Sequence, residues 1–289
     1  KLTESIGKPK ELWKSLKALG LPKTTTPSSA KTCLKHNDSL SFEQQKNAEI
    51  FKDFYSNLAE TLLKKLPSAP MIFKKQFLSA CYQKFENNNF KFSQVSVETV
   101  QQILSNINPN KSSGIDNISG RFIQDGALIL SLPITQICNL SISSSCFPRR
   151  CKIAKLKPIY KKGSKTDPQN YRPISLLPLI SKVIEKVIHD QTQNYLSENN
   201  ILYKYQSGFR SNHSTNSCLS YLTDLISKGF DSGLYTGMIL IDLQKAFDTI
   251  DHEILLEKMI YLGFSKQSIK WFRCYLSNRT FVVSITERI

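Results

Sequence analysis

One stretch of the chain decides its fold: residues 238–248 read Met-Ile-Leu-Ile-Asp-Leu-Gln-Lys-Ala-Phe-Asp. Its first four residues are apolar and include β-branched members, which predicts a strand buried on both faces. This strand would end on Asp242, and a carboxylate held by rigid backbone could bind a divalent cation. Asp also caps strands and opens turns, so the stretch taken alone favours a structural role.

The composition indicates a globular protein with a polyanionic partner. Of the 289 residues, 40% are apolar, which is enough for a core. Thirty-nine Lys and Arg against twenty-three Asp and Glu give a net charge of +16. Such a surplus suits nucleic acid or an anionic membrane. Nucleic acid ranks higher because the charge gathers around a predicted hairpin and not along an amphipathic helix.

The seven cysteines include no Cys-x-x-Cys pair, which argues against a disulfide framework and for a reducing compartment. Neither Cys146 nor Cys151 has a histidine nearby, so both are interpreted as small buried hydrophobes. The longest apolar tract, residues 127–134, is short of the ~20 residues that span a bilayer. We therefore expect an intracellular protein without a membrane partner, in the cytoplasm and nucleus. The chain opens on Lys1 and stops inside an expected strand, so we expect a fragment.

Helical spacing and breakers divide the chain into predicted elements. We expect helices or helical faces at residues 11–19, 42–66, 96–107, 122–144, 179–188, 218–226, 255–262 and 266–276, with a polar linker at 23–35. Residues 1–92 carry no chemical motif and are interpreted as a helical extension or linker. Residues 93–289 form the second predicted unit.

A glycine loop follows the helix predicted at 96–107. Lys111 and Gly114 lie in it, and Gly114 would permit an unusual backbone angle in a tight turn. With basic and hydroxyl neighbours the loop could lie against phosphates, although a surface turn is an equally good interpretation.

The densest positive charge lies between residues 149 and 172, with nine basic residues against one acid. Residues 154–157 alternate as a half-buried strand does, residues 163–168 supply a turn, and residues 171–176 continue as a second strand, which Pro173 confines to an edge. Lys161 and Arg172 flank the turn and can converge on one anion such as a triphosphate. Lys162 is the alternative for the first position.

Four segments, in this order, resemble the reverse transcriptases of LINE-type (non-LTR) retrotransposons, among them jockey-like elements. They are Lys-x-x-Gly-x-Asp at 111–116, Pro-Ile-x-Lys-Lys-Gly leading to Asn-Tyr-Arg-Pro-Ile-Ser-Leu-Leu at 158–177, Gln-x-Gly-Phe-Arg-x-x-x-Ser-Thr at 206–215, and motif A at 241–250. The resemblance covers roughly residues 96–289. It implies an α+β fold comprising the fingers and part of the palm of a right-hand polymerase.

The same resemblance implies roles for individual residues. Asp242 would bind the metal ions and be catalytic, and the backbone carbonyl of Leu243 could supply a further oxygen to them beside the bound nucleotide. Lys161 or Lys162, with Arg172, would bind the triphosphate. Phe247 would exclude a ribose 2′-hydroxyl, although base rates favour a core position for it. Lys111, Gly114, Gln206 and Arg210 are expected to face nucleic acid, while Asp251 is interpreted as a helix cap.

The implied activity is RNA-directed DNA polymerisation on an RNA template from a DNA primer with dNTPs. Two Mg²⁺ ions, or Mn²⁺, would clamp the displacement. The Phe/Tyr-x-Asp-Asp turn of the family is absent from this sequence, so the chain alone is expected to be inactive. Two alternatives stay open: a non-catalytic RNA-binding module, and a decayed or domesticated element. The sequence gives no indication of oligomeric state.

Overall fold

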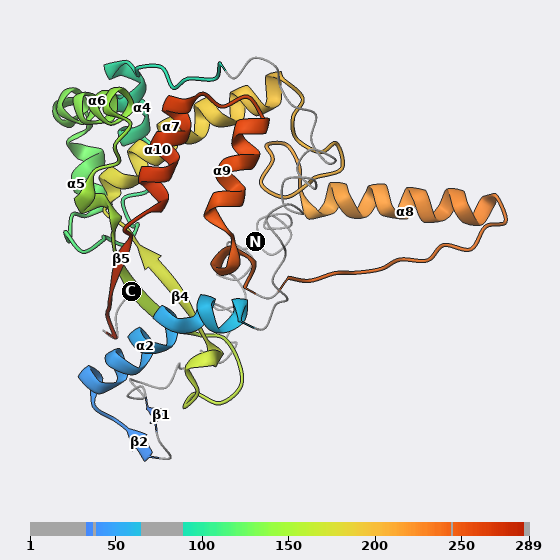
Figure 1. Ribbon diagram of the computed structural model, residues 1–289, viewed down its shortest axis with the longest axis horizontal. Coiled ribbons are helices and arrows are strands. Elements are labelled where there is room, and N and C mark those ends of the chain that lie inside the picture. The colour runs from blue at the N-terminus through green and yellow to red at the C-terminus, as the bar shows by residue number, and fades with distance from the viewer. Residues whose placement is uncertain (1–32, 37–38, 65–88, 244, 286–289) are drawn as a thin grey trace, which may run out of the picture.

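The computed structural model describes residues 33–36, 39–64, 89–243 and 245–285, and Figure 1 labels its elements. In chain order these are β1 (Leu34–His36), β2 (Ser39–Ser41), α2 (Gln44–Leu63), α4 (Val97–Ser105), α5 (Gly120–Asp125), α6 (Ala127–Ser144), η2 (Arg149–Lys152), β3 (Ile153–Tyr160), η3 (Pro168–Asn170), β4 (Tyr171–Leu176), α7 (Leu179–Glu198), α8 (Thr215–Asp231), η4 (Ala246–Thr249), α9 (His252–Tyr261), α10 (Lys266–Leu276) and β5 (Thr280–Val283). The helix predicted at 11–19 and most of the linker at 23–35 lie outside the described residues.

A small mixed sheet lies between the helices. Its strand order is β4-β3-β5, with β3 antiparallel to β4 and parallel to β5. Pro173 therefore lies on an edge strand, as predicted, where its missing N–H removes no ladder bond to a further strand. Helices and strands together confirm the α+β class.

The main core lies among α4, α5, α6, α7 and α10, which gather on one side of the sheet in Figure 1. The α7 face predicted from residues 179–188 is buried there. Trp271 of α10 is also fully buried, and its indole N–H donates to the Ser141 hydroxyl of α6 over 3.0 Å. The periodic apolar faces thus meet one another, as amphipathic helices must.

Two smaller clusters attach other elements to this core. Helix α2 packs Phe51 against Tyr171 of β4, with ring centroids 5.0 Å apart. Helices α9 and α10 share a second cluster around Leu256 and Phe264. Phe90 forms a parallel β-bridge with Phe264, so residues on both sides of position 92 contribute to this cluster.

Helix α6 has one buried and one exposed face. The stretch expected to be helical at 122–144 forms two helices that meet at Gly126, and Pro133 lies inside α6. Because Ile129 is 80% exposed, water can bind the carbonyl that Pro133 leaves without its N–H partner. Among the described residues, α6 is also the one helix with the length and composition of a membrane span, and its partly buried side belongs to the core.

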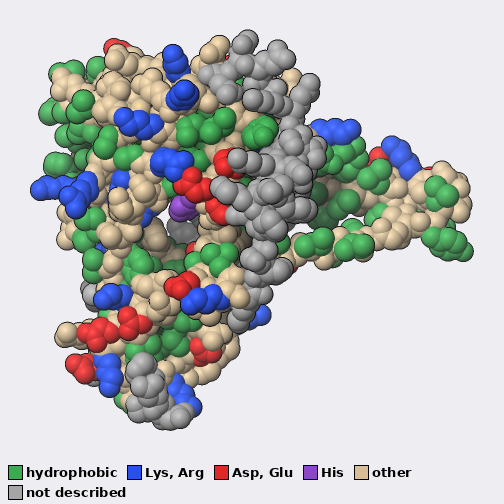
Figure 2. Space-filling model, in the orientation of Figure 1, with side chains coloured by type: hydrophobic (Ala, Val, Ile, Leu, Met, Phe, Trp, Pro, Cys, Tyr) green, Lys and Arg blue, Asp and Glu red, His purple; other side chains and the backbone are tan. Residues whose placement is uncertain are grey.

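Helix α8 corrects a second expectation. Of the two N-cap candidates in the sequence, Ser214 and Thr215, the structure uses Ser214, with a full capping box to Ser217. The face expected to be buried is not: Leu219 is 60% exposed, and no residue of α8 is buried. Figure 1 shows α8 extending away from the rest of the structure, and Figure 2 shows apolar side chains along this arm. An apolar helix face becomes core only where another element packs on it, and within the described parts of the chain none covers α8.

Candidate nucleotide and nucleic-acid site

The β3–β4 hairpin has two unlike faces. Its register pairs Ile159 with Arg172 and Tyr160 with Tyr171, and the Lys161 N–H donates to the Asn170 carbonyl over 2.8 Å. Because side chains alternate along each strand, Lys161 and Arg172 lie on the same face, as diagonal neighbours. Both are exposed. The structure therefore brings together the two cations that the sequence selected.

More positive charge lies on this face. Lys155 and Lys157 alternate with buried Ala154 and Leu156 along β3, so they point to the same side as Lys161. We call Lys155, Lys157, Lys161 and Arg172 the cationic face. Lys161 directly follows the end of β3, and its N–H bond to the Asn170 carbonyl continues the ladder by one pair. Lys162 is exposed too, one position further along the chain, where this ladder bond no longer fixes its side.

The opposite face of the hairpin is packed against α2. Tyr171 is buried there against Phe51, and the Tyr55 hydroxyl donates to the Tyr171 carbonyl over 3.4 Å. Burial raises the pKa of Tyr171, as expected for a phenol removed from water. With this face covered, the cationic face is the side of the hairpin open to a ligand.

The turn between the two strands is held by its own polar groups. Gly163 has φ +88°, the left-handed region that favours glycine. The Tyr160 hydroxyl donates to the Gly163 carbonyl over 2.6 Å, and the Asn170 amide donates to the Ser164 carbonyl over 2.9 Å. The predicted turn is confirmed, and these bonds fix the separation of the strands next to Lys161 and Arg172.

The loop around Gly114 lies beside the hairpin for a reason the sequence did not show. Gly114 has no positive φ, so the expected unusual backbone angle is wrong. The residue is instead buried against backbone: a Cβ built on it would lie 2.5 Å from the Pro178 nitrogen and 2.6 Å from the Leu177 carbonyl carbon. Only glycine permits this approach, which ties the loop to the end of β4.

Lys111, in the same loop, shares a cavity of about 530 Å³ with Lys182 and Lys186 of α7. Burial lowers the pKa of Lys182, and the positive charge of Lys111 lowers it further. The sequence pattern predicted only a helical face at residues 179–188 and no site role for either α7 lysine. Their spacing of four residues places them on one face, and that spacing was the available signal.

Asp242 lies in a segment that differs from its prediction. Residues 238–243 form no strand: they are extended and exposed, with Ile239 89% exposed. A strand requires a partner for its backbone groups, and within the described residues no neighbour pairs with this segment. Asp242 and Leu243 are exposed, and within that part of the chain no hydrogen bond or ion pair joins Asp242 to Lys161 or Arg172.

The expected metal site would be built around Asp242, in residues 238–243. The Asp242 carboxylate is a suitable ligand for Mg²⁺. However, the described residues contain no group of three or more His, Cys, Asp or Glu that could hold a metal ion. They therefore do not form a complete site for the two expected ions.

Phe247 lies on the short helix η4, which contacts α2. It is 76% exposed, so the alternative interpretation of Phe247 as a core residue is wrong. Its ring meets the Phe209 ring edge to face, with centroids 6.0 Å apart. An exposed Phe247 ring is free to contact a ligand, and its role in excluding a ribose 2′-hydroxyl stays a prediction.

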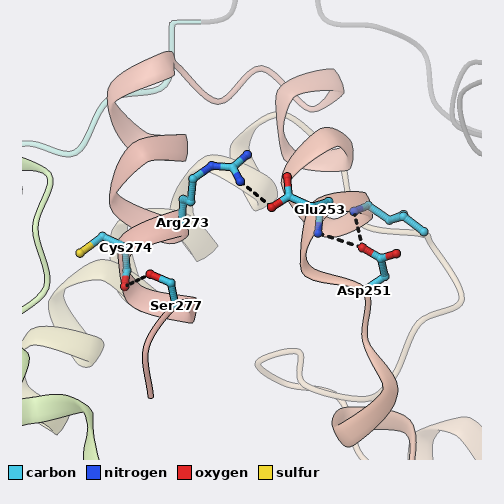
Figure 3. A network of polar contacts seen from close by, with 6 residues as sticks. Asp251, Glu253, Arg273, Cys274 and Ser277 are labelled. Atoms are coloured by element: carbon cyan, nitrogen blue, oxygen red, sulfur yellow. Dashed lines mark hydrogen bonds and ion pairs between the residues drawn. The ribbon is translucent and has the colours of Figure 1, made fainter. Parts of the chain in front are cut away.

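The remaining predicted residues make local bonds. The Gln206 amide donates to the Gly208 carbonyl over 3.0 Å, and Arg210 donates to the Tyr203 carbonyl over 3.2 Å, so both hold their own loop together. Asp251 is the N-cap of α9, as predicted, and accepts from the Glu253 and Ile254 N–H groups. Figure 3 shows this cap beside the ion pair between Glu253 and Arg273, which joins α9 to α10.

Comparison with known proteins gives a consistent result. Residues 159–288 match the family model for "Reverse transcriptase (RNA-dependent DNA polymerase)". In Drosophila melanogaster the "Probable RNA-directed DNA polymerase from transposon BS" is 32% identical over 192 residues, which is 66% of this chain and 21% of the relative. The "RNA-directed DNA polymerase from mobile element jockey" of the same organism is 30% identical over 197 residues, 67% of this chain and 21% of the relative. The chain thus spans about a fifth of the length of these curated relatives.

Proposed function

Because residues 159–288 form part of a reverse transcriptase domain of the LINE type, we propose that this chain belongs to an RNA-directed DNA polymerase of a non-LTR retrotransposon. That enzyme adds dNTPs to the 3′-hydroxyl of a DNA primer on an RNA template. In this proposal residues 93–289 are its fingers and part of its palm, and residues 1–92 are a helical extension. The protein works inside the cell, in the cytoplasm and nucleus.

The observation that carries the proposal is the placement of Lys161 and Arg172. They are exposed diagonal neighbours on the cationic face of the hairpin, beside a turn fixed by its own hydrogen bonds. Arg presents a planar fork that binds two phosphate oxygens, and Lys adds a mobile point charge. Diagonal neighbours on a hairpin lie roughly 7–8 Å apart, a span that a triphosphate chain can bridge. We therefore assign the dNTP phosphates to this pair.

The template strand is assigned to the lysines around the Gly114 loop. Lys111, Lys182 and Lys186 line one cavity, and lowering of the Lys182 pKa reflects burial together with the positive charge of Lys111 there. Asp190 lines the same cavity and pairs with Lys186 over 2.6 Å, so the charges left for a nucleic-acid phosphate to neutralise are those of Lys111 and Lys182. Gln206 and Arg210 are proposed to contact the template from the loop that follows α7.

Asp242 is proposed to supply one carboxylate of the catalytic centre. The described residues do not complete a metal site, so the chain by itself is proposed to be inactive. What this chain contributes is the phosphate-binding hairpin, one acidic ligand and, through Phe247, selection of the sugar.

Primer extension with the Asp242→Asn variant tests the proposal. The variant is placed in a polypeptide that carries this segment together with the rest of the reverse transcriptase domain, on an RNA template with a DNA primer. We expect dNTP incorporation to fall to background, because the amide lacks the charge that a metal ligand provides. Asp248→Asn is the matched control, since Asp248 is an exposed acid on η4, and its activity should be retained. Unchanged incorporation by Asp242→Asn would refute the catalytic assignment.

A non-catalytic RNA-binding module is the second candidate. It is favoured by the cationic face and by the lack of a complete metal-ligand group among the described residues. The same assay distinguishes the two functions. A module of this kind would bind RNA without extending a primer in any variant, the unsubstituted protein included.

A further inference from the structure

Two cysteines far apart in the sequence lie side by side, one shortly before β3 and the other shortly before β5. Cys146 follows the C-terminal cap of α6, and Cys274 lies in the last turn of α10. Their sulfurs are 3.7 Å apart although 128 positions separate the residues. Cys151 is buried, as the sequence predicted, but Cys146 is exposed, so its interpretation as a buried hydrophobe is wrong.

Cys274 is surrounded by hydrogen-bond donors. The Phe147 N–H donates to its sulfur over 3.3 Å, and the Lys152 ammonium lies 3.6 Å from the same atom. Lys152 is only 6% exposed, and the carbonyls of Cys274 and Ser277 hold its ammonium in place. The Ser277 hydroxyl adds a bond to the Cys274 carbonyl (Figure 3). A buried ammonium fixed beside a thiol favours the thiolate.

The two thiols differ in acidity. Burial opposes ionisation of Cys274, but the Phe147 N–H, the contact with Cys146 and the Lys152 charge together lower its pKa. The contact with Cys274, burial and the charge of Cys274 raise the pKa of Cys146, and they outweigh Lys152 and Lys270. Of the two thiols, Cys274 is therefore the more readily ionised, and we assign it as the nucleophile.

We propose that Cys274 and Cys146 form an oxidant-responsive pair, in which a hydroperoxide oxidises Cys274 and Cys146 then closes an intramolecular disulfide. In the first step the Cys274 thiolate attacks one peroxide oxygen, an S–O bond forms, the O–O bond breaks, and hydroxide leaves. In the second step the Cys146 sulfur attacks the Cys274 sulfenic acid: the S–S bond forms, the S–O bond breaks, and the leaving oxygen takes the Cys146 proton and departs as water. The hydroxide of the first step takes up the proton that Cys274 lost on ionisation, which gives the second water. In sum, two thiols and one hydrogen peroxide give one disulfide and two waters.

The geometry requires little movement for this bond. A disulfide has an S–S length of about 2.05 Å, so the sulfurs must approach by about 1.7 Å. The disulfide would join the segment that precedes β3 to the end of α10, which precedes β5. Strands β3 and β5 are paired neighbours in the sheet. Disulfides in a reducing compartment are transient and regulatory, which fits an oxidant-driven bond. The inference is independent of the polymerase assignment.

Mass spectrometry of the oxidised chain tests the proposal. The reduced 289-residue chain is treated with one to ten equivalents of hydrogen peroxide and digested without reductant. We expect a cross-linked peptide pair containing Cys146 and Cys274, a loss of two titratable thiols, and recovery of both with dithiothreitol. The unfolding midpoint should rise by about 5–10 °C on oxidation, because the link restricts a long loop of the unfolded chain.

Variants separate the roles of the two cysteines. With Cys146→Ser, dimedone should trap Cys274 as its sulfenic acid, and the cross-link should disappear. Cys218→Ser is the matched control, because Cys218 is a half-buried free cysteine on α8. In this variant the Cys146–Cys274 cross-link should form as in the unsubstituted chain. Oxidation of Cys218 or Cys33 in preference to Cys274, or a cross-link only between molecules, would overturn the proposal.

The electrostatic step has its own test. We expect Lys152→Met to slow disulfide formation about tenfold, since the thiolate loses its adjacent cation. Because Lys152 is buried and this variant could unfold, the pH dependence of iodoacetamide reaction is also measured on the unsubstituted chain. Cys274 should react with a lower pH midpoint than Cys218. An equal or higher midpoint for Cys274 would refute its role as the nucleophile.

Discussion

Lys161 and Arg172 lie on the same exposed face of the β3–β4 hairpin, as diagonal neighbours two register positions apart across the two strands. Their partners on the opposite face, Tyr160 and Tyr171, stack edge to face, and Tyr171 is buried against α2. The hairpin therefore presents its positive charges to solvent because its other side is anchored by aromatic packing. This relationship underlies the first prediction.

Replacing Arg172 or Lys161 with Ala should raise the KM for dNTP more than it weakens primer–template binding. Each change removes a charge-assisted hydrogen bond to phosphate, which corresponds to a rise of about 10-fold to 100-fold. Single-nucleotide incorporation by the domain-length polypeptide gives KM, and fluorescence anisotropy gives template affinity. Lys162→Ala is the comparison: an effect larger than that of Lys161→Ala would transfer the role to Lys162. A greater loss of template affinity than of nucleotide affinity would make the hairpin a nucleic-acid clamp.

The lysines of the Gly114 loop cavity should determine how RNA binding depends on salt. For Lys111→Ala and Lys182→Ala we expect weaker binding of single-stranded RNA by the 289-residue chain. The slope of log K against log salt should shrink by about 0.7 for each phosphate that the variant no longer neutralises. Lys228→Ala, on the exposed face of α8, is the matched control and should leave the slope unchanged. If the slope of log K against log salt is the same for all three variants, the template strand does not bind at this cavity.

Phe247→Val should admit ribonucleotides. The smaller side chain would leave room for a 2′-hydroxyl, so the ratio of dNTP to rNTP incorporation should fall. Stability should change little, because Phe247 is exposed. Incorporation of both sugars by the domain-length polypeptide is the measurement, and Phe209→Leu, at the contacting ring, is the control. An unchanged sugar preference in Phe247→Val would remove its role as a steric gate.

Gly114→Ala should destabilise the fold by about 2–4 kcal/mol, because its Cβ would overlap backbone atoms of Leu177 and Pro178 that cannot move without shifting β4. Urea unfolding followed by circular dichroism measures the loss. Gly208→Ala is the matched control: nothing lies within 4 Å of its Cβ position, and its stability should change by less than about 0.5 kcal/mol. Similar midpoints for the two variants would contradict the close approach.

Stability should fall in alkaline solution. Burial, assisted by the charge of Glu185, raises the pKa of Tyr275 to about 12, and burial raises the pKa of the Cys151 thiol to about 11. The folded chain thus holds these protons more tightly than the unfolded chain, whose values are about 10 and 8.5. Their contribution to the free energy of unfolding is complete below about pH 8.5 and is lost as pH rises to about 12.

Urea midpoints between pH 8 and 11.5 measure this effect. Tyr275→Phe is the control, since it removes one titrating group, and its alkaline decline should be shallower. A midpoint that holds steady through pH 11.5 in the unsubstituted chain would contradict the prediction.

Local elements were predictable from the sequence because their signals act over a few residues. The helix at residues 266–276 has the expected bounds, and Ser96, Ser214 and Asp251 are N-caps whose side chains bind N–H groups two or three positions on. The hairpin was equally predictable, since alternating apolar and polar residues and a turn specify it within one short segment. Its cationic pair followed from the same local pattern.

Contacts between distant residues were decided only by the tertiary structure. The apolar run before Asp242 predicted a buried strand, but burial and pairing depend on partners elsewhere in the chain, and the run is extended and exposed. The packing of Gly114 on Leu177 and the meeting of Cys146 with Cys274 have no local signature at all. Periodicity and capping specify an element through its own few residues, whereas burial, register and proximity depend on which surfaces the whole chain brings together.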